Sequence, residues 1–322
     1  MRLRLVKQGT SFDFFSRWKL WLGISGLLMV VAMVSFFLQG LNYGIDFRGG
    51  TTIRTESTQP IDVAQYRAAM EALQLGDITI TEVFDPTFPE DQNVAMVRIQ
   101  AQEGQESVTA DVIQRVEAAL RAVVPDIKFV SVESVGPKVS GELITTAIIA
   151  VILAIGAVLV YIWLRFEWQF ALGAVAALVH DVVLTIGIFS ELQIKFDLAI
   201  IAALLTIVGY SLNDTVVVFD RVRENLRKYK KRPLAEVLNI SINETLSRTV
   251  MTSVTTLLAL IALFVLGGDV IRGFVFAMIW GVIVGTYSSV FVASAILLYL
   301  GVKRDWSKPT DTTGNQFANV DA

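Results

Sequence analysis

The sequence contains no cysteine and a single histidine, and only 18% of its 322 residues are charged. A chain without cysteine has no disulfide framework, no thiolate metal site and no cysteine nucleophile. A soluble domain of this length would carry more charge and would not gather its apolar residues into long blocks. Here hydrophobic residues make up 54% of the chain. The composition therefore predicts a membrane protein.

Six apolar blocks are each about long enough to cross ~30 Å of hydrocarbon. They are residues 18–38, 143–164, 168–190, 198–219, 250–266 and 274–300. Lipid offers no hydrogen-bond partner to a free backbone group, so each block is predicted to be a transmembrane helix. The first block has a long apolar run and no small-x-small cleavage site after it, so we expect it to stay in the protein rather than act as a removable signal.

Lysine and arginine lie at alternate ends of these spans. Five basic residues lie within 1–19 and eight within 220–249, whereas the short loops on the other side hold only Lys195 and Arg272. By the positive-inside rule, the N-terminal segment 1–17, the basic connection 220–249 and the C-terminal tail 301–322 are all predicted to be cytoplasmic. The connection between the first two spans then lies on the outer side. Trp18, Trp21, Trp163 and Trp168 fit aromatic anchors at the cytoplasmic interface.

The outer connection, 39–140, is too long for a plain loop. Its alternation and helical periodicity predict strands at 51–57, 78–84, 93–100 and 127–134, with helices at 61–75 and 107–123. The order βαββαβ is that of a ferredoxin-like α+β domain. With 15 acidic and 8 basic residues its net charge is −7. Two interpretations stay open: a surface that touches an exported chain, or a spacer that docks a partner.

Two glycine-containing segments join this domain to the membrane. "GIDFRGG" (44–50) leads into the first strand, and "VGPKVSGEL" (135–143) leads back to the second span. Gly49, Gly50, Gly136 and Pro137 suit either a hinge or a tight turn at the domain junction. The general use of glycine in turns favours the tight turn.

Asp214 is the polar residue that most needs an explanation. In "GYSLNDTVVVFDRVREN" (209–225) it precedes four apolar residues and lies roughly 8 Å inside the cytoplasmic end of its span. Aspartate is too short to snorkel far, so it must be protonated, paired or in contact with water. Ser211, one turn away on the same face, is expected to be its polar neighbour. Of a proton site and a buried structural ion pair, we favour the proton site, which would include the adjacent Asn213.

Two further polar groups lie in other spans. His180 and Asp181 lie near the bilayer midplane, and since adjacent helical positions diverge by ~100° we expect them to face different neighbours. A proton relay and simple helix contacts are equally open for this pair. Arg248 begins the fifth span on the cytoplasmic side, so it could pair with Asp214. Hydroxyl residues at 245, 249, 252, 253 and 256, Thr252 among them, predict either a wet path or interhelical hydrogen bonds.

Two other patterns favour structural roles. Ala277, Gly281, Gly285, Ser289 and Ala293 recur every four residues, which is typical of a helix-packing face. The basic stretch 221–232 favours a topology determinant in contact with lipid headgroups, with a docking site for a cytoplasmic partner as the weaker alternative. The outer connection holds no histidine, nucleophile–base pair or metal-ligand cluster, and we predict no catalytic residue, metal or cofactor.

Five segments in order resemble the SecD/SecF family of bacterial protein-export subunits, and within it the proteobacterial SecF branch. They are "GIDFRGG", "VGPKVSGEL", "RFEWQFALGAVAALVHDVVLTIG", "GYSLNDTVVVFDRVREN" and "TLSRTVMTS", and they extend over nearly the whole chain. Relatives often have another residue where Ser247 stands, but the neighbouring Arg248 is kept.

The resemblance implies a multi-pass protein of the bacterial inner membrane, with a periplasmic outer domain and an RND-type fold. It implies pairing with SecD, work with the SecYEG channel and YajC on a translocating polypeptide, and use of the proton-motive force. It also assigns Asp214 and Arg248 to proton flow. Two alternatives are an intramembrane aspartyl protease using Asp181 and Asp214, whose further sequence elements are absent, and a small-molecule efflux subunit, for which the outer connection is small.

Overall fold

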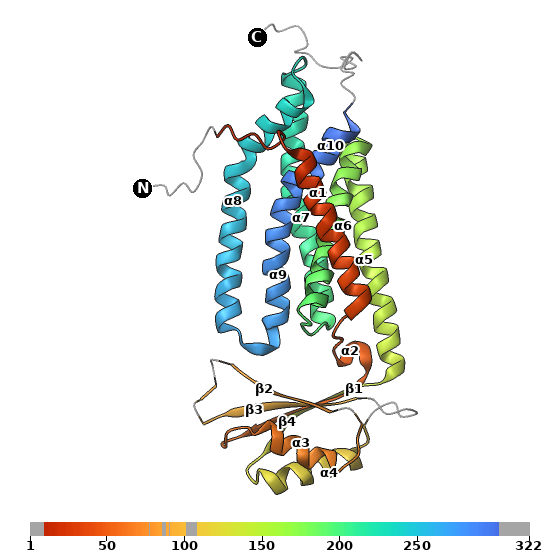
Figure 1. Cartoon of the computed structure of the whole chain (residues 1–322), viewed down its shortest axis with the longest axis vertical. Helices are drawn as coiled ribbons and strands as arrows, with labels where there is room; N and C mark the ends of the chain where they lie inside the picture. The colour runs from red at the N-terminus through yellow and green to blue at the C-terminus, as the bar shows by residue number, and fades with distance from the viewer. Residues whose placement is uncertain (1–9, 77, 86–87, 90, 101–107, 303–322) are drawn as a thin grey trace, which may run out of the picture.

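The protein consists of a bundle of long helices with a small α+β domain at one end (Figure 1). A computed structural model describes residues 10–302 except 77, 86–87, 90 and 101–107. Within these residues six helices are long and apolar enough to cross a membrane, which confirms the predicted spans. Residues 1–9 and 303–322 of the predicted cytoplasmic segments lie outside the described residues.

The spans are longer than their apolar blocks. They are α1 Trp18–Gln39, α5 Pro137–Arg165, α6 Trp168–Glu191, α7 Leu198–Lys228, α8 Leu234–Leu266, and a last span made of α9 Gly268–Ser288, a π-helix Ser289–Ala293 and α10 Ser294–Leu300. The π-helix was not expected, and the hydroxyl of Ser294 donates to the carbonyl of Ser289 across it.

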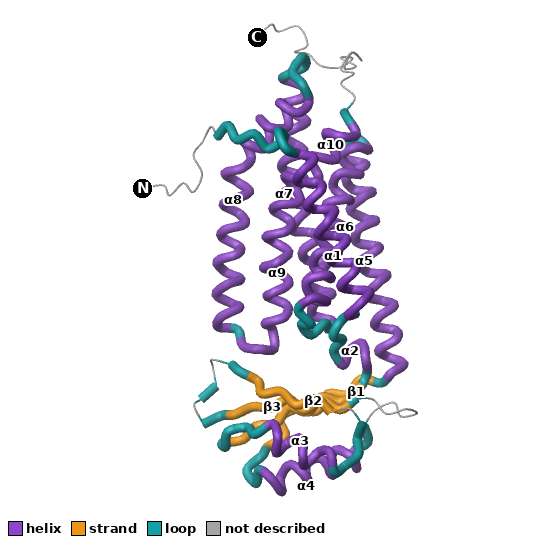
Figure 2. The backbone as a smooth tube through the Cα atoms, in the orientation of Figure 1, coloured by secondary structure: helices purple, strands orange, loops and turns teal. Residues whose placement is uncertain are grey.

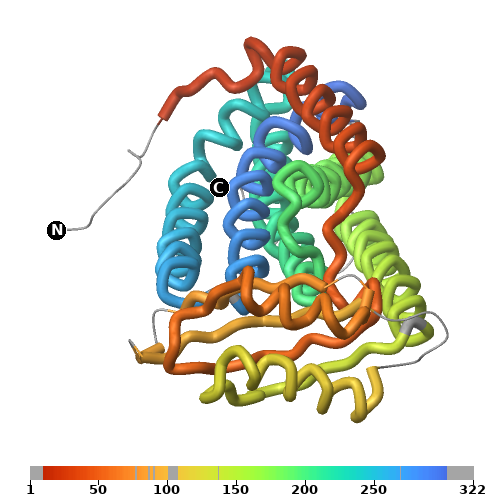
Figure 3. Tube along the Cα trace, turned by 60° about the horizontal axis from the view of Figure 1, so that its bottom comes forward, coloured from red at the N-terminus to blue at the C-terminus, as the bar shows by residue number. Residues whose placement is uncertain are grey.

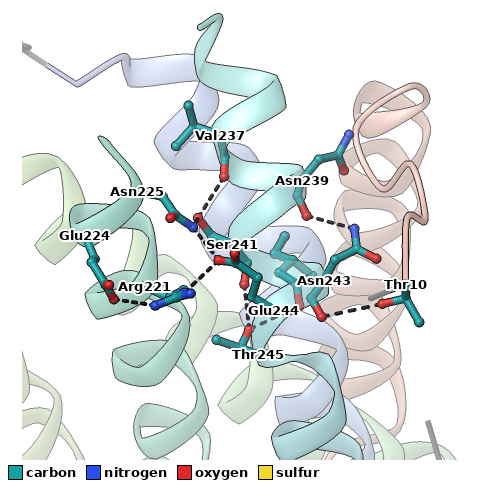
Figure 4. Close-up of polar contacts among 11 residues, drawn as sticks. Thr10, Arg221, Glu224, Asn225, Val237, Asn239, Ser241, Asn243, Glu244 and Thr245 are labelled. Carbon is teal, nitrogen blue, oxygen red and sulfur yellow. Dashed lines mark hydrogen bonds and ion pairs between the residues drawn. The ribbon is translucent and has the colours of Figure 1, made fainter. Parts of the chain in front are cut away.

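The predicted cytoplasmic connection 220–249 is helical except at 229–233, because α7 and α8 both continue past their apolar blocks. Polar contacts hold these two helical arms together (Figure 4). The amide of Asn225 donates to Ser241 (3.0 Å) and Glu244 (2.6 Å), and the Nε of Arg221 donates to Glu244 at 2.7 Å. The arms also bury apolar side chains, among them Val222, Leu226 and Val237, but these are interspersed with charged residues, so a search for continuous apolar blocks does not find the arms.

The chain before α1 is attached to the α8 arm by two asparagines one turn apart. The side-chain carbonyl of Asn239 accepts from the backbone N–H of Phe14 at 2.8 Å. The side chain of Asn243 accepts from Phe12 N–H at 2.9 Å and donates to Phe12 O at 2.8 Å. Thr10, also drawn in Figure 4, donates to the backbone carbonyl of Asn243. The described residues before α1 are thereby positioned against the end of the bundle opposite the α+β domain.

The row of small residues in the last span packs against α7. A Cβ on Gly281 would overlap the side chain of Ile207, and a Cβ on Gly285 would lie 3.0 Å from the Cβ of Ser211. Ala277 and Ala293 are also fully buried. The predicted helix-packing face is confirmed, and it brings the backbones of α7 and α9 close together.

The outer domain has the predicted βαββαβ order. Its elements are β1 Gly50–Ser57, α3 Val63–Glu71, β2 Ile78–Val83, β3 Asn93–Ile99, α4 Ala110–Val123 and β4 Lys128–Val135. The sheet order is β2-β3-β1-β4, and every pair is antiparallel. Helices α3 and α4 cover one face over a core that includes Ile53, Tyr66, Val97 and Leu120. The other face of the sheet is turned toward the helix bundle, as Figure 2 shows.

The junction between bundle and domain is a short helix and a glycine turn. The helix α2 spans Ile45–Arg48 and was not predicted. Gly49 and Gly50 then have φ values of 73° and 123°, which favour glycine. The structure thus agrees with the tight turn, while a hinge function stays a prediction. At the return, Gly136 precedes the first residue of α5, Pro137.

The junction is also tied to the connection between α6 and α7. The N–H of Gly44 donates to Phe196 O at 2.7 Å, and the N–H of Phe196 donates to Asn42 O at 2.8 Å. The carboxylate of Asp46 accepts from the N–H of Leu198, the first residue of α7, at 3.0 Å. Figure 3 shows the domain turned forward beneath this end of the bundle. The domain is therefore attached to α7 as well as to α1 and α5.

Replacing Gly281 with valine should destabilise the bundle, because the new side chain would overlap Ile207. Overpacking of this kind costs about 1–3 kcal/mol. The control is Gly156→Val on α5, where a Cβ meets nothing within 4 Å. Thermal unfolding in detergent should show a lower midpoint for Gly281→Val only, and equal midpoints would contradict the close packing.

The outer domain should loosen in acid around Asp126. Its carboxylate accepts from the hydroxyl and the backbone N–H of Thr58 and from the hydroxyl of Ser57. These bonds, that from the Thr58 hydroxyl foremost, hold the pKa of Asp126 below its usual range. A lowered pKa in the folded state stabilises above the unfolded pKa of about 3.9, and this stabilisation is lost as the pH falls through the folded value.

Hydrogen exchange of the peptide covering 50–60, corrected for its intrinsic rate, should therefore rise in acid in the native chain. In Asp126→Asn the corrected exchange should be faster at neutral pH and depend little on pH. Asp91→Asn, an exposed aspartate of the same domain, is the control. If Asp126→Asn kept the acid response of the native chain, the assignment to this carboxylate would be wrong.

Candidate functional site

Three helices meet around the carboxylate of Asp181. One oxygen accepts from the hydroxyls of Ser211 on α7 (2.6 Å) and Ser288 on α9 (2.8 Å), and the other lies 2.9 Å from Nδ1 of His180. His180 and Asp181 are each 1% exposed. The two adjacent residues have different neighbours, as expected, since Asp181 contacts the two serines and His180 stacks on Tyr287; their contact with one another was not expected. Asp181 is a fully engaged hub of the bundle.

His180 keeps one ring nitrogen without a partner. Its Nε2 is buried and makes no hydrogen bond within the described residues. The imidazole stacks on Tyr287, whose hydroxyl bonds to Ser25 (2.9 Å) and to the backbone carbonyl of Trp21 (3.2 Å) on α1. A buried ring nitrogen without a partner costs free energy. The relay itself stays a prediction.

Asp214 lies one turn beyond Ser211 on α7, and its hydrogen bonding differs from that of Asp181. It is 4% exposed, and its Oδ2 is buried without a hydrogen-bond partner in the part of the chain that the structure describes. Ser211 does not supply one, because its hydroxyl is directed to Asp181; that expectation is wrong. A carboxylate buried in this way must be protonated or be reached by a cation or water.

Helix α8, which packs beside α7, carries a row of buried hydroxyls at the level of Asp214. Thr245, Thr249 and Ser253 are each less than 9% exposed, and the Oγ1 of Thr249 also lacks a partner among the described residues. Tyr210 contacts Thr256 at one level and Asn225 contacts Ser241 at another, so the helices run antiparallel. Asp214 and Thr249 both lie between these two levels. Two buried polar atoms without partners thus occur on facing helices.

Ser253 and Thr252 differ in what they contact. Ser253 bonds to Thr286 on α9 at 2.7 Å, so part of the row forms interhelical hydrogen bonds. Thr252 donates to the backbone carbonyl of Arg248 at 2.8 Å and lies off the buried row. The hydroxyl pattern therefore divides into a buried face toward α7 and α9 and an outer face.

Arg248 and Asn213 both lie on exposed faces of their helices. The charge of Arg248 acts on Asp214, but no salt bridge within 4.0 Å joins them in the described chain. The pairing of Asp214 with Arg248 stays a prediction, and a direct ion pair would require Arg248 to turn into the interface between α7 and α8. Asn213 points away from the buried side of α7, so it is not placed beside the Asp214 carboxylate.

The sequence reading missed the contribution of the last span. Tyr287 and Ser288 belong to the run Thr286–Ser289, four hydroxyl residues inside an otherwise apolar span. The spacing of small residues in this span includes only Ser289 of that run. It supplies a donor to Asp181, the ring that stacks on His180 and the partner of Ser253. Four consecutive hydroxyls in an apolar span are a signal that could have identified it.

Asp181 and Asp214 do not form a shared-proton pair. No hydrogen bond joins the two carboxylates in the described residues, and Asp181 is occupied by two serines and a histidine. Two acids that activate water together must share a proton across a short distance. Asp181 on α6 is thus held by hydrogen bonds, whereas Asp214 on α7 is a separate acid with an oxygen that lacks a partner in the described residues.

Two family models match the chain. "Protein export membrane protein SecD/SecF, C-terminal" matches residues 115–303, and "SecD/SecF GG Motif" matches residues 34–61. The chain is 63% identical over 321 residues to "Protein translocase subunit SecF" of Cereibacter sphaeroides, covering 100% of this chain and 99% of the relative. It is 59% identical to the protein of that name from Rhodobacter capsulatus, covering 99% and 97%.

Two solved structures have the same fold. A crystal structure of SecDF, "a translocon-associated membrane protein" from Thermus thermophilus, matches with a TM-score of 0.80 and 36% identity, over 91% of this chain and 39% of that one. SecDF in a super-membrane-facing form matches with a TM-score of 0.69 and 37% identity, over 93% and 40%. The chain thus spans about 40% of the length of these solved chains.

Removing a donor from the Asp181 hub should destabilise the bundle. Ser211→Ala or Ser288→Ala leaves a buried carboxylate with one bond fewer, at a cost of about 1–3 kcal/mol. Because both serines serve one oxygen, the double variant should deviate from the sum of the two single effects. Thermal unfolding measures this, with the exposed Ser16→Ala as control. Unchanged midpoints in both single variants would show that Asp181 does not depend on these hydroxyls.

Proposed function

Because the chain belongs to the SecD/SecF family of protein export membrane proteins, we propose that it couples the proton-motive force to late steps of translocation, with Asp214 as its proton-binding group. Its role in protein export, within a SecDF complex, follows from that membership. The family is one of transport proteins and not of enzymes. The use of proton flow and the residues that carry it are the proposal.

The observation that carries the proposal is the contrast between two buried acids. Asp181 has a partner on every side, whereas the Oδ2 of Asp214 has none in the described residues. A structural carboxylate would be expected to have its donors in place, as Asp181 does. A carboxylate that binds and releases a proton needs an environment that can change. Asp214 lies at the middle of α7 but near the end of its apolar block, residues 198–219, on the side predicted to be cytoplasmic.

Helix α8 supplies the two groups that would change the environment of Asp214. Thr249 presents a buried hydroxyl without a partner at the same stretch of the α7–α8 interface, and Arg248 precedes it by one residue. When Asp214 is ionised, the guanidinium of Arg248 is attracted toward it; when Asp214 is protonated, that attraction is lost. Proton binding would thereby shift α8 relative to α7. Asn213, on the outer face of α7, would act at a surface between subunits rather than on the carboxylate.

Association with SecD is supported by the SecDF structures, in which the matching region is about 40% of a longer chain. We further propose the SecYEG channel, YajC and the translocating polypeptide as partners, on the family resemblance alone. His180 and Asp181 are assigned to holding α6, α7 and α9 together. Gly49, Gly50 and Gly136 are proposed as the junction through which motion of the bundle reaches the outer domain.

The chain is a multi-pass membrane protein, consistent with the bacterial inner membrane. We propose that both termini are cytoplasmic and that the α+β domain is periplasmic. The bias of lysine and arginine supports this orientation. Trp163 and Trp168, at the end of the bundle opposite the domain, are 63% and 51% exposed, as expected of interface anchors.

The two alternative functions, an intramembrane protease and an efflux subunit, are not supported. The family's transport function and the separate states of Asp181 and Asp214 leave no case for an aspartyl protease. Membership of a family of protein-export subunits likewise leaves no case for a small-molecule efflux subunit.

Asp214→Asn should abolish the stimulation of export by the proton-motive force, because an amide of the same size cannot be protonated and released. Export of a reporter protein would be measured in inverted membrane vesicles with and without a protonophore. In the native complex the protonophore should reduce late-stage export, whereas in Asp214→Asn export should already be at the reduced level. Co-purification with SecD should be unchanged.

The matched control is Asp220→Asn, the same change six residues along α7. Asp220 is about half exposed and pairs with Arg165 at the surface, so it should retain protonophore-sensitive export. If Asp214→Asn kept that sensitivity while still bound to SecD, the carboxylate would have no part in proton coupling.

A further inference from the structure

A cavity of about 220 Å³ lies between the outer domain and the bundle. Its walls come from the junction, from the connection between α6 and α7, and from the face of the sheet that α3 and α4 leave uncovered. The residues that matter for its chemistry are Arg48, Arg98, Lys195, Thr79 and Thr81. None of them takes part in the proposed proton site.

Three cations from three different segments converge on this cavity. Arg48 ends α2, Arg98 is on β3, and Lys195 precedes α7. Two of them come from an outer segment whose net charge is −7, so their position is not a consequence of general basicity. Like charges gathered in one cavity repel one another, and an anion bound between them would remove that cost.

Arg98 is the group that is least well satisfied. Its Nε is buried and has no hydrogen-bond partner among the described residues. Burial, and then the neighbouring charge of Arg48, lowers the pKa of its guanidinium, while Asp197 and Asp46 act in the opposite sense from a distance. Those two carboxylates are already engaged, Asp46 by the N–H of Leu198 and Asp197 by Lys195 and Ala199. An additional acceptor is what Arg98 lacks.

The position of the cavity indicates where that acceptor comes from. The last turn of helix α1 carries Phe37 and Leu38, which are 76% and 80% exposed and suited to lipid. Asn42, four residues beyond Leu38, already lines the cavity. On the other side of the cavity, Leu192 and Leu198 are also exposed on either side of Lys195. The cavity therefore lies just beyond the apolar level of the bundle, at the depth of lipid headgroups.

We propose that this cavity binds the phosphate of a phospholipid headgroup from the outer leaflet. Arg48 and Arg98 donate to the phosphate oxygens, Lys195 adds a third positive charge, and the hydroxyls of Thr79 and Thr81 lie along the same wall. Guanidinium groups match phosphate geometry, with two parallel N–H donors each. A lipid held here contacts both the sheet and the bundle. It would fix the outer domain against the membrane, independently of proton transfer at Asp214.

The test uses the full chain co-purified with SecD, delipidated in detergent, with dioleoylphosphatidylglycerol added from mixed micelles. Native mass spectrometry counts bound lipid, and thermal unfolding reports stabilisation. Arg98→Gln and Lys195→Gln should each weaken the tightest lipid binding by about tenfold, which corresponds to about 1.4 kcal/mol. Arg115→Gln, the same change on the exposed side of α4, should bind as the native chain does. Lys195 is 42% exposed, so its variant tests the site even if Arg98→Gln unfolds.

Three further additions identify the ligand. Dioleoylglycerol, which lacks the phosphate, should not bind in place of the phospholipid, and inorganic phosphate should compete weakly. If inorganic phosphate stabilised the protein as well as the phospholipid did, the site would be one for free phosphate and the lipid assignment would be overturned. An acidic peptide that displaced the phospholipid would assign the site to the polypeptide instead. Equal lipid binding by the native chain and both cavity variants would overturn the site altogether.

Discussion

The structure depends on one constraint: polar groups inside a helix bundle must find partners without help from bulk water. Asp181 meets it with two serine hydroxyls and an imidazole drawn from α6, α7 and α9. This hub is possible only because small residues let the helices approach closely. Gly285 lies directly against Ser211, so the packing face of the last span is what brings the Ser211 hydroxyl within reach of Asp181. The close helix packing and the hydrogen bonding of Asp181 thus depend on the same small residues.

Much of this architecture could be predicted from local patterns. Apolar blocks of sufficient length identified the six spans, and alternation identified the four strands, because both patterns follow from the surroundings of each element alone. The helical arms at 220–249 are not predicted by apolar blocks, because their buried residues, such as Val222, Leu226 and Val237, are interspersed with charged ones. The short helix α2 was missed because its place is set by bonds to Phe196 and Leu198, about 150 residues further along the chain.

The candidate site, like the fold, could be predicted only where a local pattern in the sequence identifies a residue. A carboxylate inside an apolar span is costly whatever surrounds it, so Asp214 could be selected from sequence alone. The acid that each hydroxyl contacts could not be predicted, because Ser211 is one helical turn from Asp214 and yet bonds to Asp181 on another helix. Helical spacing gives the face on which a side chain lies, but the partner across that face depends on the register between helices. His180 and Asp181 show the further limit that side-chain torsions can bring together two residues whose Cα–Cβ directions diverge.

Helix α7 connects the junction of the outer domain, the Asp181 hub and the arm of α8. Its first residue, Leu198, is bonded to Asp46 of the junction that leads into the outer domain. Ser211, one turn before Asp214, bonds to the Asp181 hub, and Asn225, near the last residue of α7, bonds to the arm of α8. Any movement of α7 that changed the surroundings of Asp214 would therefore either break the bond from Ser211 to Asp181 or carry α6 with it. In the second case the movement would also reach the junction, because the loop between α6 and α7 is bonded to Asn42 and Gly44. Helix α7 therefore carries Asp214 on the same rigid element whose first residue is hydrogen-bonded to the junction of the outer domain.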